Sequence, residues 1–471
     1  KPDQKPDQKP DQRGFDAVFI AVECTPSSLS SDSRVSHRPS RNPLAGRNLL
    51  ISAQQPSNIE AGGRGIRDRQ PGDLLVIGVL LVLTALPDAM VVPILEELMV
   101  VRYDVDPGLS HAFISINLLG GLCALPLLRI AMRRGRPILA VAIAAVADAA
   151  LLAAMWLPIG FGPTLLLRAV EGAADVMVFA VVFDLVGQAG RRGGAGLRFG
   201  FGAALLSMAL GGGAILGGQL ARGDTGTGET ARAVYLVGAS ACLLAGLVAF
   251  ACRNRLRRLE GIAAEPTEDR IEPTPIQTAR APLWPLMLMA GADRAAGGLL
   301  TGTLGLFLAE AVGLEPSLRG GLIGSVLLLM GLGAIPAGWV SDRFGDLLVR
   351  AVGGIIFAIG LFLLPTAASN LSSLSATMLL LGVGGATLLP TSLALLDRLH
   401  GGLVGMGGFR AAGDIGFLVG VLVAGLLIHM LGDGDGSRFG YASVIAGFAI
   451  MHLSCTAIVI PLLARHDRRS I

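Results

Sequence analysis

The sequence has few charged residues and almost no lysine. Asp, Glu, Lys and Arg make up 15% of the 471 residues, while 52% are hydrophobic. Ordinary soluble domains carry roughly 25% charged residues. The only lysines are Lys1, Lys5 and Lys9, in a Lys-Pro-Asp-Gln repeat that covers residues 1–12 and is unlike the rest of the chain. The repeat carries no prediction of fold. The low charge excludes an ordinary soluble domain.

Other absences exclude whole classes of function. The five cysteines are irregularly spaced and most lie in apolar runs, so they predict neither a disulfide framework nor a zinc site. A formal net charge of +3 without a basic patch argues against nucleic acid as a partner. No catalytic triad, nucleotide fingerprint, metal signature or phosphate-cradling loop stands out. We therefore expect no enzyme, no cofactor, no metal site and no ATP hydrolysis by this chain.

What the sequence has in abundance is apolar runs of the length that crosses a bilayer. We expect twelve spans, at 74–93, 113–131, 137–157, 164–186, 199–220, 233–252, 283–309, 321–340, 347–368, 374–396, 404–428 and 441–463. They divide the chain into a disordered tail (1–72), a first six-helix bundle (73–253), a cytoplasmic linker (254–282), a second six-helix bundle (283–465) and a short C-terminal tail (466–471). The twelve spans therefore predict an all-α membrane protein.

Arginines predict the orientation of these spans. They gather before the first span, after every second span, and after the last, as in Arg133-Arg134-Gly135-Arg136 and Arg253 to Arg258. The alternate loops hold fewer arginines. Since positive charge favours the cytoplasmic side, we expect both termini and the linker in the cytoplasm, in a multi-pass protein of the cell membrane.

One loop motif joins two of the spans. Gly338-Trp-Val-Ser-Asp342-Arg343-Phe-Gly345 lies between the eighth and ninth spans, and a partial echo, Arg133-Arg-Gly-Arg136, lies roughly 210 residues earlier. Gly-x-x-x-Asp-Arg-x-Gly resembles the loop signature of the major facilitator superfamily of secondary transporters. The resemblance covers about residues 74–463. It implies twelve helices in two pseudo-symmetric six-helix bundles, a monomer, and transport of a small-molecule substrate by alternating access.

Three further stretches resemble that superfamily. Leu165 to Gly172 is similar to its Arg-x-x-x-Gly motif, which implies proton coupling through Arg168. Gly211 to Gly218 is similar to the Gly-Pro-x-x-Gly-Gly signature of antiporters, with Ala214 where proline is usual. We expect Gly213, Gly217 and Gly218 to serve helix packing. Pro87-Asp88 to Pro93 is similar to the Asp-then-Pro pattern of drug efflux members.

The first-half copy of the loop motif departs from the signature. Met132 stands at the aspartate position and Leu128 at the glycine position, so we expect an altered gate on that side. In the intact copy, Gly338, Asp342, Arg343 and Gly345 are the predicted gating residues. We expect Asp342 to face Arg198, and Met132 to leave Arg410 without an equivalent partner.

Eight charged residues inside the spans are the candidates for proton coupling and the substrate cavity, because charge in a membrane is functional by default. Arg168, Glu171 and Asp175 share one helix face through their i, i+3, i+7 spacing. The alternative is that some of the eight only pair structurally, as Asp293 and Arg294 could do with each other. We expect Asp148, the histidines 111, 400, 429 and 452, and Trp156 to be structural or interfacial. The eight are Asp88, Arg168, Glu171, Asp175, Asp293, Arg294, Arg410 and Asp414.

The favoured function is efflux of a small molecule in exchange for protons. Five of the eight candidates are acids and three are arginines, which suggests a cavity that accepts cations. Two alternatives stay open. One is a metabolite or ion symporter or importer on the same fold, which the Ala214 departure favours. The other is a membrane scaffold or sensor that has lost transport, which Met132 favours.

Overall fold

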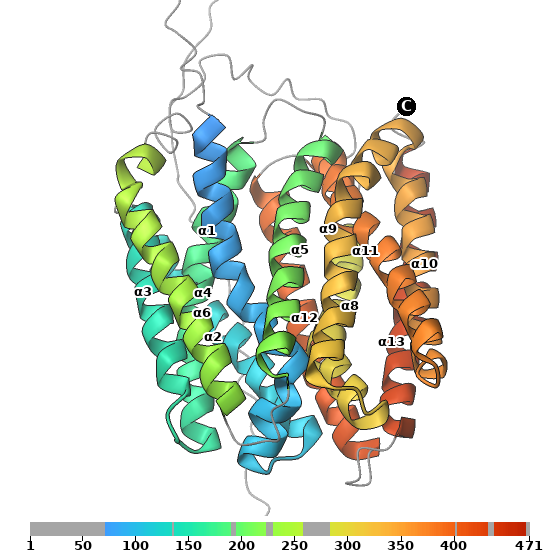
Figure 1. The fold of residues 1–471 in the computed structure, drawn as a ribbon. Helices are drawn as coiled ribbons and strands as arrows, with labels where there is room; N and C mark the ends of the chain where they lie inside the picture. Colours follow the sequence, from blue (N-terminus) through green and yellow to red (C-terminus); the bar gives the residue numbers. More distant parts are fainter. Residues whose placement is uncertain are drawn as a thin grey trace, which may run out of the picture. The chain divides into compact units, whose positions relative to one another are not determined.

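The computed structural model describes residues 71–133, 136–189, 195–222, 229–257, 283–400, 403–431 and 438–467. Within these ranges the chain forms twelve long α-helices and no strand (Figure 1). The predicted tail (1–72), the predicted linker (254–282) and the last residues lie largely outside them. The boundaries of these segments and of the two bundles therefore stay predictions.

Six helices precede the linker and six follow it, as the apolar runs predicted. The first six are α1 (Pro71–Met90), α2 (Pro107–Arg133), α3 (Pro137–Met155), α4 (Phe161–Ala189), α5 (Ala195–Leu220) and α6 (Glu229–Ala251). The short helices η1 (Val92–Ile94) and η2 (Glu96–Val101) join α1 to α2. The second six are α8 (Trp284–Leu306), α9 (Pro316–Phe344), α10 (Asp346–Ala367), α11 (Leu371–His400), α12 (Leu403–Leu431) and α13 (Arg438–Asp467), with η3 (Phe307–Ala311) after α8.

Ten of the twelve helices are long and apolar enough to cross a membrane by length and composition. The other two are α4 and α8. Helix α4 carries Arg168, Glu171 and Asp175, and helix α8 carries Asp293 and Arg294. Charged residues lower the mean hydropathy of a helix. Such a helix can lie in a bilayer when its neighbours shield the charged side chains from lipid.

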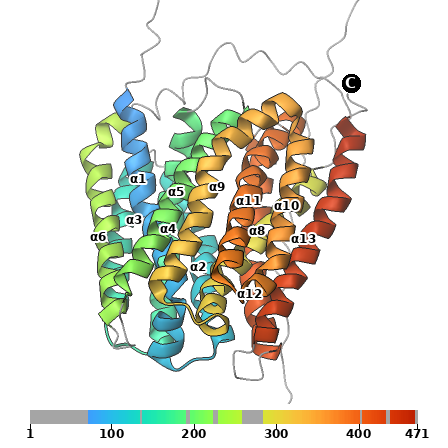
Figure 2. The ribbon, with the colours of Figure 1, turned by 45° about the vertical axis from the view of Figure 1, so that its right-hand side comes forward.

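The two halves repeat one packing scheme (Figures 1 and 2). In the first half α1 packs on α5 and α6, α2 on α4, and α3 on α6. In the second half α8 packs on α12 and α13, α9 on α11, and α10 on α13. Helices in the same order within each half thus occupy equivalent places, and the pseudo-symmetry expected from the sequence is present in the fold.

The halves meet along two helix pairs, α5 with α9 and α2 with α12. Glycines allow the backbones to approach closely in both pairs. A Cβ atom on Gly218 of α5 would lie 2.5 Å from the carbonyl oxygen of Pro316, and one on Gly108 of α2 would lie 2.6 Å from that of Gly425. Gly213 and Gly217 make similar approaches to α1, at 2.3 Å from the carbonyl oxygen of Leu86 and 2.1 Å from that of Met90.

Candidate functional site

Arg168 on α4 is the centre of a charged cluster in the first half. Its side chain is buried, and its Nη1 lies 2.5 Å from Oε1 of Glu171, one turn along the same helix. Its Nη2 lies 3.7 Å from Oδ1 of Asp88 on α1, and its guanidinium lies over the ring of Phe113 at 5.0 Å from the ring centre. The i, i+3 relation of Arg168 and Glu171 was visible in the sequence, whereas Asp88 reaches Arg168 only through the packing of α1 on α4.

Three further polar groups extend this cluster. Asn117 of α2 donates a hydrogen bond of 2.6 Å to Glu171. Asp175 is buried one turn beyond Glu171, within electrostatic range of Asp88. Asp148 of α3 is buried and accepts a hydrogen bond from the Cys242 thiol of α6 at 3.0 Å. Two carboxylates, Asp88 and Glu171, thus contact the guanidinium, and two further acids are buried nearby, so the acids outnumber the cations in this described part of the chain.

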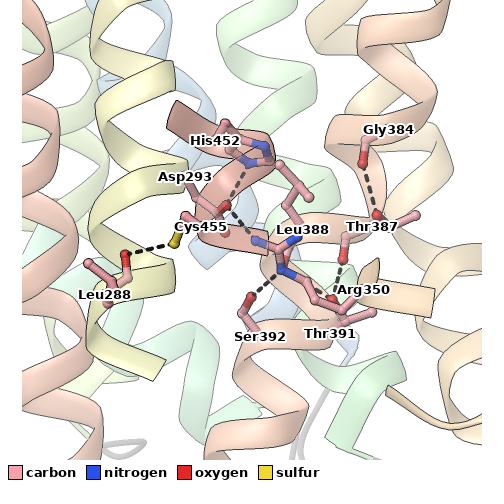
Figure 3. A network of polar contacts seen from close by, with 10 residues as sticks. All are labelled: Leu288, Asp293, Arg350, Gly384, Thr387, Leu388, Thr391, Ser392, His452 and Cys455. Atoms are coloured by element: carbon pink, nitrogen blue, oxygen red, sulfur yellow. Dashed lines mark hydrogen bonds and ion pairs between the residues drawn. The ribbon is translucent and has the colours of Figure 1, made fainter. Parts of the chain in front are cut away.

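A second buried cluster lies in the second half and involves a residue that the sequence analysis missed (Figure 3). Asp293 of α8 pairs with Arg350 of α10 at 2.5 Å, not with the adjacent Arg294. Arg350 is fully buried and also donates to the hydroxyl of Ser392 at 3.2 Å. Nε2 of His452 on α13 lies 2.9 Å from the same Asp293 oxygen. Arg350 lies inside the ninth predicted span, and this position in the sequence could have identified it as a buried charged residue.

Arg294 instead faces α12. Its Nη2 lies 3.9 Å from Oδ1 of Asp414, and its guanidinium lies over the ring of Phe417 at 4.9 Å from the ring centre. Nε of Arg410, one turn before Asp414, lies 2.9 Å from the other carboxylate oxygen. The side chains of Arg294 and Arg410 are 50% and 63% exposed, in contrast to the buried Arg168 and Arg350.

The predicted gating loop between α9 and α10 contains two acids with different surroundings. Asp342 and Arg343 are exposed. Asp346, at the start of α10, is buried and is bound by the Ser341 hydroxyl and the guanidinium of Arg398 on α11. Gly345 allows the tight connection because its φ of 92° is rarely adopted by other residues. Gly338 is buried near the end of α9. The side chains of Arg198 and Met132 lie outside the described residues, so both pairings proposed for them stay predictions.

Contacts between the two halves gather on the side of the protein where α1 ends and α9 begins, which we call the distal side. Arg319 of α9 is 1% exposed and pairs with Glu96, at 3.2 Å, and with Glu97 of η2. Nε2 of His111 on α2 lies 2.9 Å from the hydroxyl of Thr303 on α8, and the ring of His429 on α12 lies 3.2 Å from Asp106. The sequence analysis missed Arg319 and its two partners.

Burial raises the pKa of two carboxyl groups in the short distal helices. Glu96 has a pKa above its usual range because it is desolvated and lies beside Glu97, although Arg319 opposes the shift. Desolvation raises the pKa of Glu310 in η3 to about 7, while a hydrogen bond of 2.8 Å from the Tyr441 hydroxyl has the opposite effect. The distal side therefore holds two carboxyl groups with raised pKa values, and the pKa of Glu310 lies near neutral pH.

Comparison with known proteins agrees with this arrangement. The family model of the Major Facilitator Superfamily matches residues 283–470 in sequence, which is the second half of the fold. The fold as a whole resembles crystal structures of a bacterial homologue of the human lysosomal transporter Spinster. The second half of the chain is therefore similar in sequence to the major facilitator superfamily, and the whole fold is similar to that of the Spinster homologue. No curated protein matched it significantly in sequence.

The two Spinster homologue structures are both inward-facing, one occupied and one unoccupied. Each shares 14% sequence identity with this chain at a TM-score of 0.59, over 84% and 86% of this chain and 96% and 98% of theirs. At such identity the likeness concerns the fold alone. The family match and the shared fold together support a multi-pass membrane transporter that works by alternating access, and not an enzyme.

Proposed function

We propose that this transporter is coupled to protons and exports a small molecule in exchange for them. The observation that carries the proposal is the Arg168 cluster, in which Asp88 and Glu171 contact one buried guanidinium and Asp175 and Asp148 are buried nearby. An unpaired carboxylate in a low-dielectric interior costs several kcal/mol, and protonation removes that cost. Such a cluster favours binding one or more protons.

The geometry supports Asp88 as the group that exchanges protons with water. Its side chain is 26% exposed, whereas Arg168 and Glu171 are buried behind it. When Asp88 is ionised, its contact with Arg168 holds α1 to α4. When Asp88 takes up a proton, this attraction weakens and Glu171 keeps Arg168 paired. Proton binding would thus change the contact between two helices of the first half.

The arginine distribution supports the proposed setting, a cell membrane with both termini in the cytoplasm. On that assignment the distal contacts of Arg319 hold the two halves together on the outer side of the membrane. We also propose that the transporter works as a monomer, since one chain supplies both halves of the fold.

Import by proton symport is the second candidate, and Ala214 favours it. Antiporters of the superfamily carry proline at this position, according to the motif that Gly211 to Gly218 resembles. Ala214 is fully buried in α5, and its carbonyl oxygen would lie 2.6 Å from a Cβ atom on Gly320 of α9. The segment thus packs the two halves together without the proline. The direction of substrate movement separates symport from antiport.

Transport measurements test the proposal. Cells that lack their own efflux pumps and express this chain are first screened for resistance to toxic compounds of positive, negative and no charge. A compound that the chain protects against is then followed in everted membrane vesicles with an imposed pH gradient. We expect transport that depends on the gradient and loses this dependence in Asp175→Asn and Asp88→Asn.

Asp104→Asn is the matched control. Asp104 is exposed and has a φ of 52°, a conformation that asparagine tolerates well, so this change should leave coupling intact. Transport that ignores the pH gradient in the original chain, and is unchanged in Asp175→Asn, would refute proton coupling. Substrate that leaves acid-inside everted vesicles together with protons, instead of accumulating in exchange for them, would replace export with symport.

A further inference from the structure

The exposed residues of α8 and α12 fall into stripes of different chemistry. On α12, the large apolar side chains of Ile415, Val419, Leu422 and Leu426 form one exposed stripe, as expected for a surface that meets lipid. A second stripe on the same helix holds Arg410, Asp414 and Phe417 at i, i+4, i+7 spacing.

The corresponding residues of α8 are small or polar. Gly297 and Thr301 are partly exposed on the same helix face as Arg294, whereas Trp284 and Leu288 form a separate apolar stripe. An arginine that faced hydrocarbon in mid-membrane would be costly. The polar stripes of α8 and α12, joined by the Arg294 and Asp414 contact, therefore face water and not hydrocarbon.

The acids counted in the sequence are mostly not on that surface. Glu171 and Asp175 are buried beside Arg168, and Asp293 is paired with the buried Arg350. Among the eight predicted cavity residues, the two most exposed side chains are both arginines, Arg294 and Arg410. One carboxylate, that of Asp414, lies between them, and its side chain is 18% exposed.

We propose that Arg294 and Arg410 bind an acidic group of the transported molecule, a carboxylate, phosphate or sulfonate. Guanidinium groups present paired N–H donors that match the oxygens of such groups. Phe417 stacks on Arg294 and keeps its guanidinium in place. Asp414 occupies the site in the absence of ligand, and the acidic group competes with it for Arg294, which it contacts at only 3.9 Å. The cation-accepting cavity suggested by composition is replaced by an anion-binding one.

This inference names the substrate class of the proposed transporter and so rests on the proposed function, but its test needs neither transport nor a pH gradient. Phenylglyoxal, a water-soluble reagent, modifies arginines that water can reach. The full chain in phosphatidylcholine vesicles is treated with it, and modified residues are identified by peptide mass spectrometry. The competing probes are benzyl phosphate, benzoate and benzyltrimethylammonium, which share a ring and differ in charge.

We expect Arg294 to react, and benzyl phosphate and benzoate to slow its reaction by roughly threefold or more, while benzyltrimethylammonium does not. The buried Arg168, Arg319 and Arg350 should stay unmodified. Arg343, which is exposed outside the cavity, should react at the same rate with every probe. Asp414→Asn removes the internal competitor and should lower the anion concentration needed for protection by roughly two- to fivefold.

An unreactive Arg294 would overturn the proposal, because it would place the side chain in lipid. Equal protection by the cationic and anionic probes, or no protection by any, would overturn it as well. Adding phosphatidylglycerol to the vesicles distinguishes an acidic lipid headgroup from a soluble anion, since protection by the lipid alone assigns the site to headgroups. Transport by the original chain that ignores the pH gradient, together with intact anion protection of Arg294, would refute the proposed function and leave this inference standing.

Discussion

Arg350 of α10 and Asp293 of α8 form a buried ion pair, with 2.5 Å between Nη2 and Oδ1. His452 of α13 contacts the same carboxylate oxygen, so one acid connects three helices of the second half (Figure 3). A buried charge that loses its partner is strongly destabilising, because desolvation is no longer compensated. The pair therefore makes the packing of α8, α10 and α13 depend on each charge being present.

We predict that Arg350→Ala lowers the free energy of unfolding by about 3–5 kcal/mol, since it leaves Asp293 buried without its cation. Thermal unfolding in detergent, followed by tryptophan fluorescence, measures the change. Arg294→Ala is the control on the neighbouring position, because its side chain is half exposed and its contact with Asp414 is 3.9 Å long. Equal losses in the two variants would contradict the distinct roles assigned to Arg350 and Arg294.

The double replacement Asp293→Leu with Arg350→Met sharpens this test. It removes both charges and keeps similar volumes, and such replacements of buried pairs are often neutral or stabilising. We expect the double variant to unfold at a higher temperature than Arg350→Ala. If it is equally unstable, the loss arises from packing and not from an unpaired charge.

The sequence predicted the helices well because each span is specified locally. Length and hydropathy identify a span such as α10, and the i, i+3 spacing of Arg168 and Glu171 identifies a contact within one helix. Partners on different helices follow from tertiary packing, which local patterns do not encode. The chain thus gave no sign that Arg319 meets Glu97, 222 positions earlier, or that Asp346 and not Asp342 is the bound acid of the gating loop.

The Arg319 contacts predict a conformational change in Arg319→Ala. Removal of the guanidinium leaves Glu96 and Glu97 facing each other, so the distal side should separate more often. Spin labels at exposed positions 109 on α2 and 431 on α12, in a chain whose cysteines are replaced by serine, report the separation by electron paramagnetic resonance. We expect the population with a longer inter-label distance to rise by about tenfold or more.

Arg232→Ala is the matched control for this measurement. Arg232 is an exposed arginine near the start of α6, where it lies over the ring of Trp156 within the first half. Its removal changes the charge of the protein by the same amount without affecting contacts between the halves. A distance distribution that shifts equally in both variants, or in neither, would contradict a closing role for Arg319.

Glu310 predicts a pH dependence of stability. Its folded-state pKa of about 7 lies above the ordinary value of 4.5, so the folded protein binds a proton more tightly than the unfolded chain does. This contribution to stability is fully present below pH 4.5 and is lost as pH rises through about 7. In Glu310→Gln the unfolding temperature should fall less between pH 5 and pH 8 than in the original chain. Glu315→Gln, at an exposed position in the same loop, should keep the full slope.

Two glycines of α5 predict opposite effects of the same substitution. A Cβ atom on Gly218 would lie 2.5 Å from the Pro316 carbonyl oxygen and 2.9 Å from Cα of Gly320, and backbone atoms of α9 can yield only if the two halves shift apart. Gly218→Ala should therefore destabilise the protein by about 1–3 kcal/mol. Gly212 has no atom within 4 Å of the same position, so Gly212→Ala should stabilise the helix by up to about 1 kcal/mol. Unfolding temperatures of the two variants in one detergent decide the matter, because an unchanged or higher value for Gly218→Ala would show that the α5 and α9 crossing is not closely packed.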